Sequence, residues 1–205
     1  MARLRAVFAV VGQYRGRGKN RAQYVRKSAE ALSRLEGIDT VRVDDIERIS
    51  ATPDNAVATT TLTLALLAAG DWAIAIAISP EADVRPDIAT AAATKATTAL
   101  KSFKTGRVEV VQWLDSEAGF SKTQSTENIE ATFSLLHQVI SRRSHQGREA
   151  TNLVRAGWTQ VEAAEELGVS KQAINQRLQA AGWHAEEAGW ALAVNFLQAA
   201  HDGVR

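Results

Sequence analysis

The sequence predicts an α/β (α+β) N-terminal domain followed by an all-α domain that contains a helix-turn-helix. Three observations support this expectation. Apolar, strand-like segments alternate with helical segments up to residue 114, a polar stretch without periodicity follows them, and the rest of the chain has helical periodicity. We therefore expect an α/β domain at residues 1–116, a linker at residues 117–126 and a helical domain at residues 127–205.

The first domain is expected to alternate strands with helices. Its strands, rich in valine and isoleucine, are residues 4–12, 40–49, 72–79 and 106–114, the second becoming acidic toward its end. Its helices are residues 22–37, 52–70 and 87–103. In residues 72–79 isoleucine stands at every second position with alanine between, so both faces are apolar and the strand is predicted to be central in the sheet.

The last third of the chain is predicted to be helical. Its expected elements are helices at residues 127–143 and 148–157, a helix-turn-helix at residues 159–181 and a final helix at residues 186–201. Thr159 and Glu162 have the spacing of a capping box, which starts the first helix of the motif. Gly168 suits the sharp turn, and Ser170 suits the N-cap of the second helix.

The second helix of the motif has the polar face expected of a recognition helix. Ile174 and Leu178 share the opposite, apolar face. Amide and lysine side chains can bond base edges, so we expect base reading by Ser170, Lys171, Gln172, Asn175 and Gln176. Phosphate contacts are expected from Thr159, Gln160, Arg142, Arg143, Arg148, Arg155, Arg177 and Gln179. The simpler alternative is an ordinary helical hairpin with a solvated polar face.

Composition excludes several classes of function. The 205 residues include no cysteine, so disulfides, thiol catalysis and cysteine-based zinc sites are excluded. The formal net charge of +1 argues against a bulk polyanion binder. The N-terminus has too short an apolar run for a signal peptide, and threonine, glycine and aspartate interrupt residues 56–78. We therefore expect no membrane span and a cytoplasmic location.

A basic, glycine-rich loop follows the first expected strand, and an acidic group ends the second. The loop residues that could bind phosphate are Arg15, Arg17 and Lys19. The loop has neither the dinucleotide-binding nor the Walker pattern, so a solvated turn is the simpler interpretation. Asp44, Asp45 and Glu47 could hold Mg²⁺ through carboxylate oxygens. We favour the alternative that they form a solvated strand end paired to nearby arginines, and we expect no metal site.

The sequence has no evident catalytic constellation. None of its 4 histidines lies three or four residues from another, so a helical zinc pair is absent, and no serine lies in a G-x-S-x-G elbow. We therefore expect neither enzymatic activity nor a bound cofactor.

The segment GWTQVEAAEELGVSKQAINQRL, with the tryptophan-bearing helix after it, resembles the end of the SatD family of bacterial proteins. The same segment is similar to sigma-factor-type and MarR-type helix-turn-helix segments. In the N-terminal half, AVFAVVGQYRGR lacks the aspartate of the family's first strand. Within VRVDDIERI, only Asp44, Asp45 and Glu47 correspond to the family's acidic GDEFQ-like turn. WAIAIAIS and the Ala-rich helix after it fit a later strand and helix of the family. The resemblance implies a regulator with a sensor-like N-terminal domain.

These features predict a sequence-specific transcriptional regulator that inserts residues 170–181 into the major groove of double-stranded DNA. Helix-turn-helix proteins commonly bind two half-sites, so a homodimer is expected. The N-terminal domain would supply dimerisation or the response to an unidentified small-molecule effector. One alternative is that the N-terminal domain is a nucleotide-binding protein or enzyme and that the helix-turn-helix only directs it to its target. In that case nucleotide with magnesium should raise the melting temperature of the protein. The other is a protein-interaction module, whose binding would depend little on salt.

Overall fold

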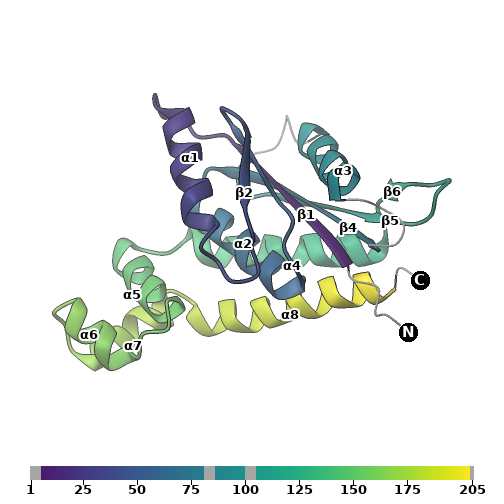
Figure 1. Cartoon of the computed structure of the whole chain (residues 1–205). Coiled ribbons are helices and arrows are strands. Elements are labelled where there is room, and N and C mark those ends of the chain that lie inside the picture. The colour runs from purple at the N-terminus through teal and green to yellow at the C-terminus, as the bar shows by residue number, and fades with distance from the viewer. Residues whose placement is uncertain (1–5, 81–85, 100–104, 204–205) are drawn as a thin grey trace.

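Valine, isoleucine and alanine build the central strands of a mixed sheet (Figure 1). The computed structural model describes residues 6–80, 86–99 and 105–203. Its strands are β1 (Ala6–Tyr14), β2 (Val41–Asp45), β3 (Arg48–Ala51), β4 (Trp72–Pro80), β5 (Val108–Trp113) and β6 (Phe120–Ser121). They form one six-stranded sheet in the order β2-β3-β1-β4-β5-β6. β1 pairs antiparallel with β3 and β4, whereas β5 is parallel to β4.

The helices connect these strands and then continue to the C-terminus. Within the described residues they are α1 (Arg21–Leu32), α2 (Ala56–Ala69), α3 (Pro86–Ala99), α4 (Gln124–Ser141), α5 (His145–Arg155), α6 (Gln160–Glu166), α7 (Lys171–Ala180) and α8 (Trp183–Asp202). The elements from β1 to β4 follow the β-α-β-β-α-β order of the ferredoxin-like motif, with β3 between β1 and β2. The sequence did not indicate this strand order, because it is set by pairing between distant segments.

Large and small residues alternate along β4, and the two faces of the sheet pack against different helices. Ile74 and Ile76 belong to the core that α2, α4 and α8 cover. Ala75 and Ala77 point to the other face and pack with alanines of α3. Small side chains on both surfaces let this helix lie close to the strands. Every residue from 73 to 78 has a relative exposure of 0%, so the predicted central position of this strand is confirmed.

Two helices from the C-terminal third complete the sheet's larger core. Phe133 and Leu136 of α4 lie in the same buried cluster as the strands, as do Ala193 and Leu197 of α8. Figure 1 shows α4 and α8 running along one face of the sheet. The core therefore continues past the expected linker at residues 117–126, which includes β6 and the first residues of α4.

The expected elements near the second strand differ from the structure. Residues 40–49 were expected to form one strand with an acidic end, and they instead enter a hairpin in which β2 and β3 pair antiparallel. The chain turns at Ile46 and Glu47, so the acidic residues lie at the hairpin tip. The ends of two other expected elements, residues 4–5 of the first strand and residues 100–103 of a helix, lie outside the described residues.

Helices α5, α6 and α7 form a small unit at one end of the molecule (Figure 1). They have their own buried cluster, which includes Ala150, Ala163, Ile174 and Leu178. α8 leads from this unit back along the sheet. Across the part of the chain that the structure describes, no helix combines the length and apolar character needed to cross a membrane.

Candidate nucleic-acid interface

The first helix of the predicted motif begins at a capping box. The Thr159 side chain accepts a hydrogen bond from the Glu162 backbone N–H at 3.2 Å, and the Glu162 carboxylate accepts one from the Thr159 N–H at 2.7 Å. The Thr159 hydroxyl also donates to this carboxylate at 2.9 Å. These bonds, first the one from the backbone N–H, lower the pKa of Glu162. The predicted capping box is therefore confirmed.

The turn between α6 and α7 depends on a glycine in the left-handed region. Gly168 has φ +62°, which an L side chain rarely adopts. The Val169 N–H then donates to the Ala164 carbonyl at 2.9 Å and closes the turn. The Ser170 side chain accepts a hydrogen bond from the Ala173 N–H at 3.1 Å and caps α7, as predicted.

The two helices are held together by small and branched apolar side chains. Ala163 and Ala164 of α6 are buried against Ile174 and Leu178 of α7, and α5 contributes Ala150 to the same cluster. Trp183 at the start of α8 packs against this cluster as a partly buried side chain. The alanines allow close helix approach, so the orientation of α7 relative to α6 is set by packing as well as by the turn.

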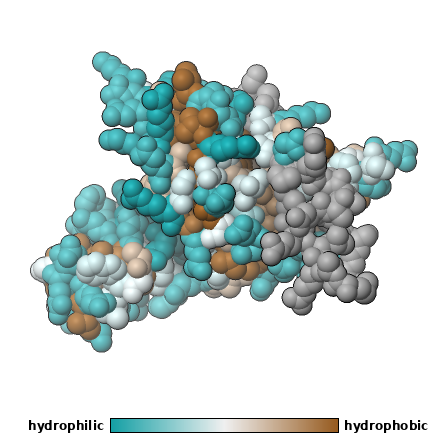
Figure 2. Space-filling model, in the orientation of Figure 1, coloured by the Kyte–Doolittle hydropathy of each residue, from teal (hydrophilic) through white to brown (hydrophobic). Residues whose placement is uncertain are grey.

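The opposite face of α7 is polar and open to solvent. Its exposed side chains are Lys171, Gln172, Asn175, Gln176 and Gln179. Within the described residues none of these side chains makes a hydrogen bond or an ion pair, so their donors and acceptors are free to meet another molecule. Figure 2 shows the α5–α7 unit as a separate lobe with a largely hydrophilic surface interrupted by smaller hydrophobic areas.

The residues predicted to contact phosphate differ in how accessible they are. Arg142, Arg148 and Gln179 are exposed, and Gln160 and Arg177 are half-buried. Thr159 is exposed, but its hydroxyl already belongs to the capping box. Arg143 has only 2% of its side chain exposed, so burial removes it from the set of phosphate contacts. Arginine side chains are mostly exposed in proteins, and nothing in the local sequence marks Arg143 as an exception.

The burial of Arg143 is tolerated because a carboxylate balances its charge and a backbone carbonyl accepts one of its hydrogen bonds. Its Nη1 lies 2.6 Å from Oε2 of Glu186, and its Nε donates to the Ala181 carbonyl at 2.7 Å. Arg155 binds the other carboxylate oxygen of Glu186, Oε1, through Nη2 at 2.6 Å. The Arg155 guanidinium carbon lies 5.7 Å from the centre of the Trp183 ring. Sequence reasoning missed Glu186, since its partners lie more than 30 positions away along the chain.

The predicted phosphate loop packs on an aromatic cluster next to the sheet. Arg17 and Lys19 are exposed, whereas Arg15 is half-buried. Tyr14 lies beneath the loop with its ring centre 4.9 Å from that of Tyr24. Burial, followed by the nearby charge of Asp71, raises the pKa of the Tyr14 hydroxyl. The loop thus presents two exposed basic side chains, Arg17 and Lys19.

The acidic residues at the hairpin tip each have a separate partner. Glu47 forms an ion pair with Arg21, and Asp45 lies 3.6 Å from Nη2 of Arg48. Asp44 accepts a hydrogen bond from the hydroxyl of Ser50 at 2.9 Å. Among the residues that the structure describes, no group of three or more His, Asp or Glu side chains is placed to hold a metal. Glu47 and Asp45 therefore pair with arginines, whereas Asp44 is bonded to a serine.

Comparison with protein-family models and with curated proteins gives no match. Among solved structures, the chain is similar to a regulator of polyketide synthase expression from Bifidobacterium adolescentis. The sequence identity is 14%, and the match covers 97% of this chain and 80% of that one. Its TM-score is 0.26, so the overall similarity is low and nothing about function follows from it. The SatD resemblance stays a prediction.

Proposed function

We propose that this protein is a sequence-specific transcriptional regulator that binds double-stranded DNA and places α7 in the major groove. The observation that carries the proposal is the free polar face of α7, on a helix whose start is fixed by the Gly168 turn and the Ser170 cap. An α-helix fits the major groove, where amide and lysine side chains can bond base edges. Gln172 and Asn175 are the strongest candidates for base reading.

Basic side chains near α7 would supply the contacts that position the protein on the DNA backbone. Arg142 and Arg148 are exposed near the N-terminal end of α5, and Arg177 lies on α7 itself. Each phosphate neutralised releases counterions, so affinity falls as salt rises. A plot of log affinity against log salt therefore has a negative slope. Replacing Arg142 or Arg148 with alanine should reduce the magnitude of this slope by about 1 each and weaken binding to all sequences alike.

A selection experiment with random duplex DNA and the full chain tests the proposal. Wild-type protein is expected to enrich a short and roughly palindromic site, because a homodimer would bind two half-sites. Gln172→Ala with Asn175→Ala should lose this enrichment, since each base contact provides about 1–3 kcal/mol of discrimination. The matched control is Gln138→Ala with Asn195→Ala, which removes the same two residue types from exposed positions on α4 and α8.

The outcomes separate the proposal from its alternatives. Loss of enrichment in the α7 variant but not in the control supports base reading by α7. Equal enrichment by all three proteins places the recognition surface elsewhere. Phosphate contacts would make any DNA binding weaken as salt rises. If the wild type enriches no sequence and shows no such salt-dependent DNA binding, the polar face of α7 is better explained as a protein-interaction surface.

A further inference from the structure

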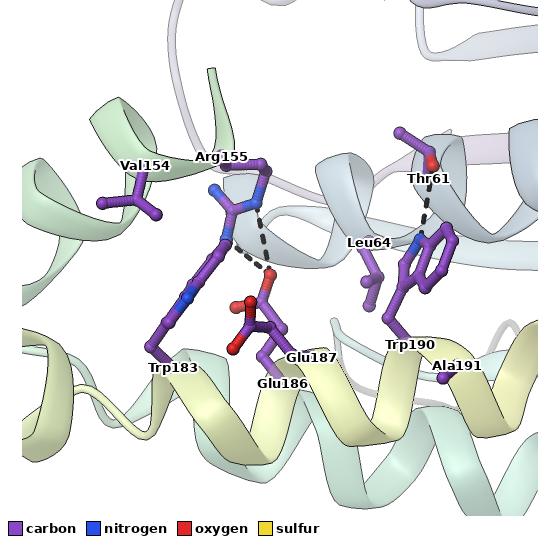
Figure 3. Close-up of a pocket in the computed structure, with 9 residues that line it drawn as sticks. All are labelled: Thr61, Leu64, Val154, Arg155, Trp183, Glu186, Glu187, Trp190 and Ala191. Carbon is purple, nitrogen blue, oxygen red and sulfur yellow. Dashed lines mark hydrogen bonds and ion pairs between the residues drawn. The ribbon is translucent and has the colours of Figure 1, made fainter. Parts of the chain in front are cut away.

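The six-stranded sheet and the helices packed on it, α1 to α4 and α8, form the sheet domain. A cavity lies where this domain meets the α5–α7 unit. Its volume is about 550 Å³, within the range of sites that hold small organic molecules. Three helices line it: α2 from the sheet domain, the last turn of α5, and the first half of α8. Figure 3 shows these residues converging from the three helices on one space.

The walls of the cavity are mainly aromatic and aliphatic. Trp183 and Trp190 stand seven positions apart on α8 and therefore share one face of that helix. Leu64 of α2 and Val154 of α5 add aliphatic side chains, and Ala191 leaves room because its side chain is small. In Figure 3 both indole rings rise from α8 toward the other two helices. Flat aromatic walls of this kind favour a planar, apolar ligand.

The charged residues of the cavity already have partners. Arg155 is bound by Glu186 and also donates to Oδ1 of Asn152 at 2.9 Å. Glu186 is shared between Arg155 and the buried Arg143. Glu187 lies 3.1 Å from Nδ1 of His184, a contact that is an ion pair only when the imidazole is protonated, and its carboxylate lies at the exposed rim. The charges of Arg155 and Glu186 neutralise one another, so a charge on the ligand would lose hydration without a free counter-ion inside the cavity, and the ligand is expected to be uncharged.

One polar side chain in the cavity is free to donate a hydrogen bond. Three neighbouring threonines of α2, Thr59, Thr60 and Thr63, each donate their hydroxyl to a backbone carbonyl four residues earlier. Thr61 makes no such bond, and it accepts only a long hydrogen bond of 3.4 Å from the Trp190 indole N–H. Its hydroxyl hydrogen is therefore available for an acceptor atom at one edge of a bound molecule.

We propose that this cavity binds an uncharged, planar aromatic molecule with a hydrogen-bond acceptor at its edge, and that its occupancy controls the orientation of α5–α7. Val154 and Trp183 line the cavity and also pack against the buried cluster of the helix-turn-helix. Thr61 belongs to α2, on the sheet domain. A ligand that bridges these residues would couple the sheet domain to the α5–α7 unit. The regulatory half of this proposal rests on the proposed function, because it assumes that α7 binds DNA.

Binding can be tested with Prodan, an uncharged planar naphthalene ketone whose fluorescence responds to an apolar environment. Saturable binding to the full chain is expected. Ala191→Phe should fill the cavity and weaken binding at least about tenfold, and Thr61→Val should weaken it about fivefold by removing one hydrogen bond. Ala188→Phe is the matched control, because Ala188 is exposed on the same helix outside the cavity and should leave binding unchanged.

Competition tests the predicted charge of the ligand. 2-Acetylnaphthalene, which is uncharged, should displace Prodan more effectively than the anion 2-naphthoate or the cation 2-naphthylmethylammonium. Absence of saturable Prodan binding to the wild type, or equal binding by wild type and Ala191→Phe, would overturn the site. Stronger displacement by either ion would overturn the predicted charge.

The regulatory step is tested by measuring DNA affinity with and without Prodan. The affinity of the wild type should change at least about threefold, whereas Ala191→Phe should bind DNA without responding to Prodan. If the wild type binds DNA and Prodan independently, the coupling is overturned. If it binds Prodan but no DNA at any salt concentration, the proposed function fails while the small-molecule site stands.

Discussion

Arg143 and Glu186 form an ion pair in which Nη1 lies 2.6 Å from Oε2, and their side chains are only 2% and 4% exposed. Arg143 follows α4, and Glu186 lies in the first turn of α8. Arg155, at the end of α5, binds the same carboxylate. This single group therefore joins the ends of three helices at the point where the sheet domain meets the α5–α7 unit.

Replacing Glu186 with glutamine should strongly destabilise the protein. The substitution keeps the shape of the side chain but leaves the buried charge of Arg143 without a counter-ion. Removing one partner of a buried ion pair typically costs about 3–5 kcal/mol of unfolding free energy. Urea unfolding followed by circular dichroism measures this change, and Glu187→Gln is the matched control because Glu187 is exposed on the next position of α8.

The control should change the unfolding free energy by less than about 0.5 kcal/mol. The double variant Arg143→Met with Glu186→Leu should be more stable than Glu186→Gln, since apolar side chains avoid the unpaired charge. A double variant that is less stable than Glu186→Gln would contradict this account of the ion pair.

Replacing Gly189 with alanine should also destabilise the protein, although alanine is normally the better helix former. A Cβ at Gly189 would fall 2.5 Å from Cδ2 of Leu136, which is buried on α4. Such overpacking typically costs about 1–3 kcal/mol, more than the roughly 1 kcal/mol that helix propensity returns. Thermal or urea unfolding gives the net sign.

The steric cause can be isolated in a Leu136→Ala background. That substitution removes the atoms that Cβ would meet, so Gly189→Ala should become neutral or stabilising there. An equal loss of stability in both backgrounds would show that close approach of α4 and α8 is not what requires glycine.

Local features of the fold were predictable from the sequence because the residues that form them are close in the chain. The capping box joins Thr159 to Glu162, and the turn at Gly168 needs only a glycine of positive φ. The central strand was predicted because isoleucine and alanine alternate over residues 72–79. In each case the physical cause lies within a few positions, so one sequence contains it.

Features that depend on distant partners were not predictable in this way. Nothing in the local sequence pairs Arg143 with Glu186, so the arginine was expected on the surface. The packing of α4 and α8 on the sheet follows from which apolar faces meet, and the amphipathic pattern of α4 does not specify its partner. The cavity beside Thr61 arises from three helices that come together only in the folded chain.

The capping box makes the stability of α6 depend on pH. Its hydrogen bonds lower the pKa of Glu162 below the ordinary value of 4.5. The folded state therefore favours the ionised carboxylate, and this contribution is fully present above 4.5 and is lost as the pH falls through the lowered folded pKa. Glu162→Gln should reduce stability at neutral pH and have a smaller effect in acid.

Urea unfolding of the wild type and of Glu162→Gln, at neutral pH and at a pH below the lowered pKa of Glu162, measures the difference in their unfolding free energy at each pH. Glu165→Gln is the control, because Glu165 is exposed on the same helix but belongs to no capping box. If the gap between wild type and Glu162→Gln stays constant across the range, the carboxylate does not act through its charge.

His137 should give the protein a second pH dependence, in a higher range. Burial lowers the pKa of His137 below its ordinary value of 6.5. As the pH is lowered, His137 of the unfolded chain is therefore protonated at a higher pH than His137 of the folded protein. The resulting contribution to stability is present above 6.5 and is lost as the pH falls from there through the lowered folded pKa. His137→Gln should flatten the stability profile in that interval, and Gln138→Ala, at the exposed neighbouring position, should keep the wild-type slope. Urea unfolding at closely spaced pH values measures both profiles, and an unchanged slope in His137→Gln would assign the pH dependence to other groups.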